Sequence, residues 1–423
     1  MRIEILCTGD EILSGKTINT NYGHIARRLI EEGLDPVWGT TVGDDRATLM
    51  AAFKQAASRA DAVIVNGGLG PTVDDLSQEV AAEAAGVGLE LHEAWLARME
   101  AFYARRNRVM PPNNRKQAML PAGAEFVDNP IGTACGFAVT IGKARFIFTP
   151  GVPREMRRMV DEQVIPRLLA MAGVKGVTRL KRFHSFGIGE SRADDMLKDI
   201  EAMAPDGRVK LGFQAHYPQL ETKLAARGDD TASLDAMLAP IEAEVRRRLG
   251  NFIVAEDTQS LEGVVLDTLR ARGGTLAVAE TLTGGNIAAR LAPGAGAETV
   301  FRRGIVSRDL AQLAAGCGAD PTAAAGGVSD ALAVALADSL RKASGASHAL
   351  VSLVQLDDAP DTPDLGGHVV VGIAGAGATV ARPARLVGGR DWVRIGAAEL
   401  ALDCLRRALL GLPVDERVDF ERR

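Results

Sequence analysis

Short apolar runs alternate with amphipathic stretches through the first 170 or so residues, and this alternation constrains the fold more than any other feature of the sequence. Strands are predicted at 2–8, 36–42, 61–66 and 145–149, and helices at 17–32, 46–59, 73–85 and behind PGVPREM at 150–156. Repeated strand–helix–strand units form a parallel sheet covered on both faces by helices. The sequence therefore predicts an α/β domain over residues 1–172.

The pattern changes twice further along the chain. Strands at 177–187, 209–217 and 221–226, with helices at 192–204 and 234–249, predict a small α+β connecting domain over 173–253. Helices at 261–272, 329–343 and 395–410 then alternate with strands at 275–279, 349–353 and 368–373, which predicts a second α/β domain over 254–423. Three domains suit a chain of 423 residues.

Composition excludes several classes of protein. The net charge of −5 argues against a dedicated nucleic-acid binder, so no stable nucleic-acid binding is expected, although a local basic patch stays open. The four cysteines are scattered, with no CxxC pair, which suits a reducing compartment. The acidic N-terminus resembles no signal peptide, and the apolar runs are shorter than the roughly 20 residues that span a bilayer. We expect a soluble, cytoplasmic protein.

Two polar segments follow predicted strands in the first domain. One is TGDE at 8–11, followed by SG at 14–15 and NTN at 19–21, and the other is GGLGPTVDD at 67–75. Ligands of open α/β sheets bind at the carboxyl ends of the strands. We therefore expect both segments to border one ligand site.

Each residue type in these segments suits a phosphorylated ligand. Glycines let the backbone approach closely, and the N–H groups at the start of the next helix can receive phosphate. Asp74 and Asp75 would repel a bare anion, whereas a divalent cation bridges carboxylate to phosphate and can activate a water. The simpler alternative is that these carboxylates complement the helix dipole and the glycines only shape a turn.

Five motifs together closely resemble the N-terminal domain of the CinA, or competence/damage-inducible, family. They are TGDEILSGKTINTN (8–21), VNGGLGPTVDDLSQE (65–79), NRKQAMLPAGA (114–124), DNPIGTACGF (128–137) and PGVPREM (150–156). That domain has the MoaB/MogA-like fold of molybdopterin-binding proteins. FGIGES (186–191) and LGFQAHYPQLETKL (211–224) resemble the connecting domain of the same family.

The resemblance implies a metal-dependent pyrophosphatase that splits ADP-ribose into AMP and ribose 5-phosphate. Its implied cofactor is a divalent metal (Mg, Mn or Co), with K⁺ as a further candidate. Asp10, Glu11, Asp74 and Asp75 are the implied catalytic residues, with Asp10, Asp74 and Asp75 as metal ligands. The implied substrate-binding residues are Thr8, Gly9, Asn19, Asn21, Gly67, Gly68, Gly70, Pro71, Thr72, Asn129, Gly132, Thr133, Gly151, Pro153 and Glu155. Asn66 stands where the family more often has threonine.

The C-terminal third resembles the family's nicotinamide mononucleotide deamidase domain, but its catalytic positions differ. AETLTGG (279–285), PGAGAETVFRRGIVS (293–307) and GGHVVVGIA (366–374) carry the resemblance. Thr281 replaces the serine nucleophile, Arg308 a tyrosine, Ala311 lies near the lysine position, and SLVQLDDA (352–359) replaces a glycine-rich loop. Thr281, Thr283, Gly284, Gly285 and Arg308 thus form a degenerate deamidase site. A threonine needs a base, which an always protonated arginine cannot supply, so this domain is expected to be inactive.

Two other functions stay open. The chain could deaminate the mononucleotide by a route in which Thr281 acts differently, or it could bind a nucleotide or pterin without turnover, acting in competence or DNA damage with a recombination partner. The resemblance also implies a homodimer. Elsewhere, Arg382, Arg385, Arg390 and Arg394 are predicted to form a solvated face rather than a phosphate clamp, and Trp392 to lie in the core.

Overall fold

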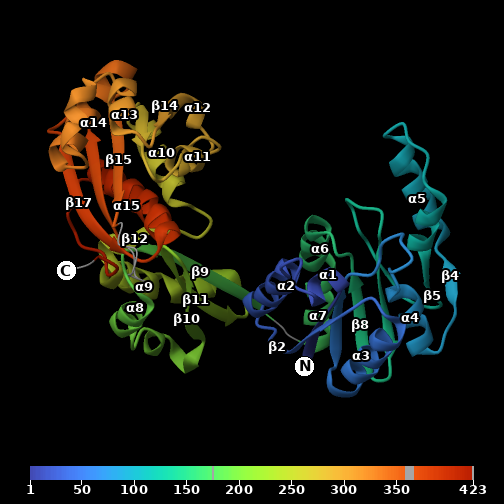
Figure 1. The fold of residues 1–423 in the computed structure, drawn as a ribbon. Helices are drawn as coiled ribbons and strands as arrows, with labels where there is room; N and C mark the ends of the chain where they lie inside the picture. Colours follow the sequence, from blue (N-terminus) through green and yellow to red (C-terminus); the bar gives the residue numbers. More distant parts are fainter. Residues whose placement is uncertain (174–175, 358–365, 422–423) are drawn as a thin grey trace. The chain divides into compact units, whose positions relative to one another are not determined.

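The computed structural model describes residues 1–173, 176–357 and 366–421. The chain forms two compact units (Figure 1). The first comprises Met1–Thr178 with Arg227–Thr231, and the second Arg179–Ala226 with Ala232–Arg423. Each unit is described by itself.

The first unit is built on a six-stranded sheet with the order β2-β1-β3-β8-β7-β6. Its strands are β1 (Ile3–Thr8), β2 (Pro36–Val42), β3 (Ala62–Asn66), β6 (Glu125–Val127), β7 (Gly136–Ile141) and β8 (Ala144–Thr149). The pairs β1–β2, β1–β3 and β3–β8 are parallel, whereas β7 pairs antiparallel with both β8 and β6. The predicted α/β fold and its four strands are confirmed, while the antiparallel edge was not predicted.

Helices cover both faces of this sheet. They are α1 (Asp10–Leu13), α2 (Thr20–Glu31), α3 (Arg46–Arg59), α4 (Ser77–Ala85), α5 (Glu93–Ala104), α6 (Pro153–Met159) and α7 (Ile165–Ala172). One buried cluster joins α3, α4 and α5 to Phe146 and Phe148 of β8. The other joins α2, α6 and α7 to Ile5 of β1 and Ile147 of β8. Because successive β8 residues pack into opposite clusters, the strand is buried on both sides, as its continuous apolar sequence predicts.

An arm interrupts the α/β pattern between α4 and β6. It consists of β4 (Leu89–Leu91), α5, the short helix η1 (Pro112–Ala118) and β5 (Met119–Pro121), with β4 and β5 paired antiparallel. In Figure 1, α5 extends beyond the edge of the sheet. Trp95 of α5 is buried and donates a hydrogen bond from its ring nitrogen to the Thr133 carbonyl at 3.0 Å, which ties the arm to the sheet domain.

The second unit contains two sheets. The connecting region has the order β10-β11-β9-β12, from β9 (Val177–Phe186), β10 (Val209–His216), β11 (Gln219–Gly228) and β12 (Ile253–Glu256), with helices α8 (Glu190–Leu197) and α9 (Thr231–Leu249). The C-terminal region has the order β14-β13-β15-β16-β17, from β13 (Leu276–Glu280), β14 (Phe301–Val306), β15 (His348–Leu356), β16 (Gly366–Ala374) and β17 (Val380–Val387). Its helices are α10 (Leu261–Ala271), α11 (Asn286–Leu291), α12 (Ala297–Val300), α13 (Leu310–Gly316), α14 (Asp330–Ser344) and α15 (Arg390–Leu410).

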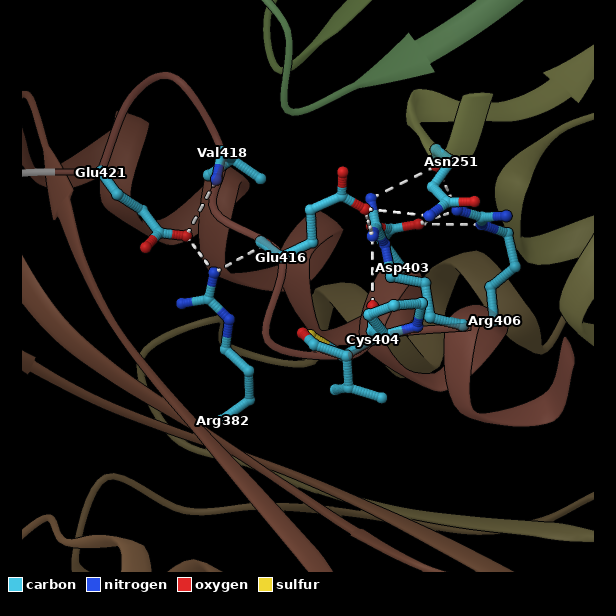
Figure 2. A network of polar contacts seen from close by, with 11 residues as sticks. Asn251, Arg382, Asp403, Cys404, Arg406, Glu416, Val418 and Glu421 are labelled. Atoms are coloured by element: carbon cyan, nitrogen blue, oxygen red, sulfur yellow. Dashed lines mark hydrogen bonds and ion pairs between the residues drawn. The ribbon is translucent and has the colours of Figure 1, made fainter. Parts of the chain in front are cut away.

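The C-terminal tail packs on the last helix through buried charges (Figure 2). Arg407 of α15 donates to Asp403 at 2.7 Å and also pairs with Glu416 of the tail. Arg382 of β17 is 4% exposed and pairs with Glu421. The prediction that Arg382 lies on a solvated face is therefore wrong, because the tail covers it. Trp392 is 53% exposed, so its predicted core position is also wrong.

Within the described part of the chain, no helix is long and apolar enough to cross a membrane. The four cysteines are buried free thiols. Burial raises the pKa of Cys135 and of Cys404 to about 12 in each case, so both are neutral at physiological pH.

Candidate active site

Four strand ends meet at one edge of the N-terminal sheet. Thr8 pairs with Val42, and Asn66 pairs with both Cys7 and Thr149, so β1, β2, β3 and β8 end side by side. The loops that follow these strands enclose a pocket of about 510 Å³. Its wall is formed by Thr8, Gly9, Glu11, Asp44, Gly67, Gly68, Leu69, Gly70, Pro71, Asp74, Asp75, Tyr103, Asn114, Gln117, Thr133, Ala134, Pro150, Gly151, Val152 and Glu155. The structure thus brings together the two segments that the sequence places at strand ends.

The turn after β3 needs glycine for steric reasons. Gly67 and Gly68 have φ values of +113° and +68°, which disfavour other residues. A Cβ at Gly67 would also lie 2.6 Å from the Thr8 hydroxyl. Ser77, at the start of α4, donates to the Gly67 carbonyl at 3.0 Å and fixes the turn. The pocket wall is therefore bare backbone at this point.

The Thr8 hydroxyl is an unpartnered polar group in the pocket wall. The side chain is 7% exposed, and its Oγ1 has no hydrogen-bond partner among the residues that the structure describes. Leaving a buried hydroxyl unpaired costs about 1–3 kcal/mol. A ligand oxygen in the pocket would supply the missing partner.

Five carboxylates line the pocket, Glu155 among them, and one of the five was not predicted. Glu11, Asp74 and Asp75 belong to the predicted segments, whereas Asp44 comes from the loop after β2. Burial raises the pKa of Asp44, and the charges of Asp10, Glu11 and Asp74 raise it further. This pocket therefore carries an excess of negative charge, as expected for a site that binds a cation.

Asp10 lies beside the pocket rather than in its wall. Its carboxylate accepts a hydrogen bond from the Asp44 backbone N–H at 3.2 Å, and its own N–H donates to the Asp44 carboxylate at 3.0 Å. The sequence suggests Asp10 as a ligand because it follows β1. In the structure, the Asp10 carboxylate is instead hydrogen-bonded to the loop that carries Asp44.

Asp75 shapes the turn that carries it. Its carboxylate accepts from the Thr72 N–H at 2.9 Å and from the Thr72 hydroxyl. These contacts delay the helix, so that α4 begins at Ser77 rather than near residue 73 as predicted. Asp74 is exposed, and the Thr72 hydroxyl is the main group that lowers the pKa of its carboxyl.

The residues fit a loosely held divalent cation. Over the described ranges, no three or more His, Cys, Asp or Glu side chains converge in a way that could hold a metal. Mg²⁺ commonly binds through one or two carboxylates, several waters and the phosphates of the substrate, and so needs no such cage. Glu11, Asp44 and Asp74 can supply those carboxylates.

The far side of the pocket is held by a buried amide. Asn129 is fully buried, donates to Glu155 at 2.7 Å and to the Ala134 carbonyl at 2.8 Å, and accepts from the Gly132 N–H at 3.1 Å. Burial raises the pKa of Glu155, and the Asn129 hydrogen bond partly offsets this. Asn129 thus positions Glu155 from behind the wall.

The other predicted substrate-binding residues divide into two groups. Asn19 accepts from the Tyr22 N–H at 2.9 Å and caps α2, and Asn21 donates to Asn66 at 2.9 Å and to the Gly151 carbonyl at 2.7 Å. Asn19, Asn21, Thr72, Asn129, Gly132 and Pro153 are absent from the pocket wall, whereas Thr8, Gly9, Gly67, Gly68, Gly70, Pro71, Thr133, Gly151 and Glu155 belong to it. Tyr103, Asn114 and Gln117 of the arm were missed because no strand end precedes them.

A second pocket, of about 370 Å³, lies in the C-terminal region. Thr281 and Arg308 of the degenerate deamidase site line it, together with Arg390. The Thr281 hydroxyl accepts from the Val354 N–H at 2.9 Å and lies 3.4 Å from the Ser352 carbonyl. This hydroxyl is 73 residues from Val354 in sequence and serves as a link between the strands.

The remaining residues of that site play other parts. Gly284 and Gly285 form the turn before α11 with positive φ, and neither they nor Thr283 line the pocket. Residues 352–356 continue β15 and pair with β16, so this part of the predicted loop replacement is a strand. Residues 358 and 359 lie outside the described ranges.

The fold and its pocket define a molybdopterin-binding-type α/β domain followed by two further modules. The family model for a probable molybdopterin binding domain matches residues 4–170. The model for the damage-inducible protein CinA KH domain matches residues 180–255, and that for the CinA C-terminal domain matches residues 258–409.

Relatives extend this match to nearly the full length. A CinA-like protein of Shewanella sediminis is 38% identical over 416 residues, covering 97% of this chain and 96% of the relative. One from Frankia casuarinae is 39% identical and covers 98% of both. A CinA structure from Thermoplasma acidophilum is 33% identical over 39% of this chain and 98% of its own, with a TM-score of 0.36. The chain belongs to the family of CinA-like proteins, which confirms the resemblance of its motifs.

Proposed function

We propose that the N-terminal unit hydrolyses the pyrophosphate of ADP-ribose to AMP and ribose 5-phosphate with a divalent metal. One observation carries the proposal: the bare backbone at Gly67 and the carboxylates of Glu11 and Asp44 share a single pocket. The first suits a phosphate and the second suits a cation, and a metal-bound pyrophosphate needs both.

The residues of the pocket have separate roles in this proposal. The backbone N–H groups that follow Gly67 would donate to the phosphate oxygens, because glycine leaves no side chain in the way. The Gly67 N–H itself already donates to the Thr149 carbonyl at 3.0 Å. The unpartnered Thr8 hydroxyl donates to one of those oxygens. Glu155, held by Asn129, borders the opposite side and orients the sugar hydroxyls.

One or two of the carboxylates of Glu11, Asp44 and Asp74 would hold the metal, with Asp10 fixing the Asp44 loop. When bound, the metal supplies charge neutralisation and a more acidic water. Hydrolysis forms a bond between the water oxygen and one phosphorus and breaks the bond from that phosphorus to the bridging oxygen. The released proton passes to the carboxylates or to solvent.

The C-terminal pocket does not suit deamidation by the same chemistry. The Thr281 hydroxyl accepts a hydrogen bond from the backbone of β15. Of the ionisable residues in the described wall, Arg308 is the one that stands at a catalytic position of the family. An arginine cannot remove the hydroxyl proton. We therefore place the enzymatic activity in the N-terminal unit, and we retain the homodimer and the competence-related partner as predictions.

The experiment is a product assay with two substrates. Purified protein is incubated separately with ADP-ribose and nicotinamide mononucleotide in the presence of Mg²⁺, Mn²⁺ or Co²⁺, with and without K⁺. AMP and ribose 5-phosphate in equal amounts support the proposal. Ammonia from the mononucleotide supports the deamidase instead, and binding of ADP-ribose without any product supports a non-enzymatic binding protein.

A further inference from the structure

The arm beside the pocket carries a cationic segment. Between Glu100 and Glu125 the chain has no acidic residue, while five basic residues occur there: Arg105, Arg106, Arg108, Arg115 and Lys116. This is unusual for a chain with a net charge of −5. Positive charge is therefore concentrated in one short part of the first unit.

Both ends of this segment are fixed at the pocket. Tyr103 at one end and Asn114 at the other line the pocket wall, and the Asn114 amide donates to the Tyr103 hydroxyl at 3.1 Å. The loop between them consequently leaves the pocket wall and returns to it. Arg105 lies two residues beyond Tyr103, and Arg115 directly follows Asn114.

The base of the segment is also bonded to the glycine-rich turn. Gln117 donates to the Leu69 carbonyl at 3.2 Å, and Lys116 donates to the Thr72 carbonyl at 3.1 Å. The two acceptors, Leu69 and Thr72, lie on either side of Gly70 and Pro71 in the turn that we assign to phosphate binding. The cationic segment is thus part of the rim of that subsite.

Among the residues that the structure describes, three of the five charges contact neither a counter-ion nor an aromatic ring. Lys116 lies 3.4 Å from Glu79, and the Arg106 guanidinium stacks 3.6 Å from the centre of the Phe102 ring. Arg105, Arg108 and Arg115 are exposed and form no ion pair in the part of the chain that the structure describes. Three unpaired guanidiniums near an acidic pocket are not needed for its fold, and guanidinium is well suited to phosphate.

We propose that Arg105, Arg108 and Arg115 bind a second phosphate group of the substrate, outside the pyrophosphate. The preferred substrates are then pyrophosphate-linked nucleotides that also carry a phosphate monoester on the nucleoside. This inference rests on the proposed function for the pocket itself. It adds a substrate preference that assays with ADP-ribose alone do not detect, because ADP-ribose has no such monoester.

The test compares ADP-ribose with ADP-ribose 2′-phosphate on the full-length protein. We measure kcat/KM for both with Mg²⁺, and Kd for both by calorimetry in EDTA. The double variant Arg105→Gln/Arg108→Gln is compared with Lys54→Gln/Lys143→Gln. The control pair removes the same charge from exposed sites, of which Lys143 lies in the β7–β8 turn at the opposite edge of the sheet from the pocket.

The wild type is expected to prefer the 2′-phosphate about tenfold in kcat/KM and in Kd. The Arg105/Arg108 variant should reduce this ratio to less than about twofold, and the control pair should keep it. A wild-type ratio near one, or a ratio that survives in the variant, overturns the inference. So does tight binding of a single-stranded oligonucleotide that displaces both nucleotides, because the segment would then be a nucleic-acid surface.

The two readouts separate this inference from the proposed function. If neither compound is hydrolysed but both bind, the proposed hydrolysis fails while the ratio of the Kd values still tests the arginines. If both compounds are hydrolysed at equal rates and bind equally, the hydrolysis stands and the inference fails. If neither compound binds in EDTA and neither is hydrolysed with Mg²⁺, both are rejected.

Discussion

Asp10 and Asp44 hold each other in place: each carboxylate accepts a hydrogen bond from the backbone N–H of the other residue, at 3.2 and 3.0 Å. This reciprocal contact joins the loop after β1 to the loop after β2. It brings Asp44 into the pocket, next to Glu11 and Asp74. One of the carboxylates of the site therefore comes from a loop that carries no recognised motif.

Replacing Asp44 by Asn is expected to stabilise the metal-free protein and to abolish turnover. Burial and neighbouring carboxylates raise the pKa of Asp44, so the folded state favours its neutral form. Ionised Asp44 therefore lowers the free energy of unfolding. This loss is absent below the ordinary pKa of an aspartate and appears as the pH rises through the raised pKa of Asp44. In EDTA at pH 7 we expect a gain of about 0.5 kcal/mol, and at pH 3 no gain. Thermal melting at both pH values checks this, and a loss of stability at pH 7 would contradict it.

Asp75 can be tested with a pair of substitutions. Asp75→Ala should abolish turnover without unfolding the protein. Asp75→Asn keeps an acceptor for the Thr72 N–H, now 2.9 Å from the carboxylate, and so preserves the turn while removing the charge. If the charge matters, Asn is as inactive as Ala, with a loss of at least about 100-fold in kcat. Full activity of the Asn variant would reduce Asp75 to a turn-forming residue.

Asn129→Asp is expected to make stability depend on pH. The new carboxylate would lie where the amide now donates to Glu155 at 2.7 Å. Two carboxylates at that separation cannot both ionise readily, so the pKa of the pair rises. Stability is then retained at low pH and lost as the pH rises through the raised value. Denaturant unfolding from pH 4 to pH 8 should show a loss that grows with pH, to about 2–3 kcal/mol at pH 8.

The matched control for that experiment is Asn129→Ala. It removes the same hydrogen bonds without adding a charge, so its loss of stability should grow less steeply with pH than that of Asn129→Asp. Equal pH dependence of the two variants would show that the pKa of Glu155 does not respond to a charge at residue 129.

In the second unit, Arg290→Met should be strongly destabilising. Arg290 donates to Glu399 at 2.6 Å, and Glu399 is 2% exposed and also bonded to Gln219 of the connecting region. Burial raises the pKa of Glu399, and Arg290 offsets this. Without its partner the carboxylate is buried and uncompensated, which costs about 3–5 kcal/mol.

Guanidinium denaturation followed by circular dichroism measures that cost. The control is Arg394→Met, because Arg394 pairs with exposed Asp391 at 3.3 Å and should contribute less than about 1 kcal/mol. Similar losses for the two variants would show that the Arg290–Glu399 pair is not an essential link.

The sequence predicts the framework of the site better than its contents. Apolar runs locate β1, β2, β3 and β8, and parallel strands bring their ends together, so Thr8 and the turn at Gly67 follow from pattern alone. Acidic residues follow several strands, so the sequence does not single out Asp44. It is the register of β2 that places Asp44 in the pocket. Local sequence could not give that register.

The arm and the C-terminal pocket show a different limit. Tyr103 and Gln117 reach the pocket through contacts with distant residues, so no local spacing marks them. Thr281 lines a pocket, but its hydroxyl accepts a hydrogen bond from Val354, which lies far along the chain. In both cases the missing information is which segments become neighbours in three dimensions.

The most direct test of the account compares wild type with Asp44→Asn. Both are incubated with ADP-ribose and Mg²⁺, Mn²⁺ or Co²⁺, and the products are separated by ion-exchange chromatography. We predict AMP and ribose 5-phosphate in equal amounts from the wild type, no product in EDTA, and at least about a 100-fold lower rate in the variant. No AMP from the wild type with any of these metals, or an unchanged rate in Asp44→Asn, would contradict it.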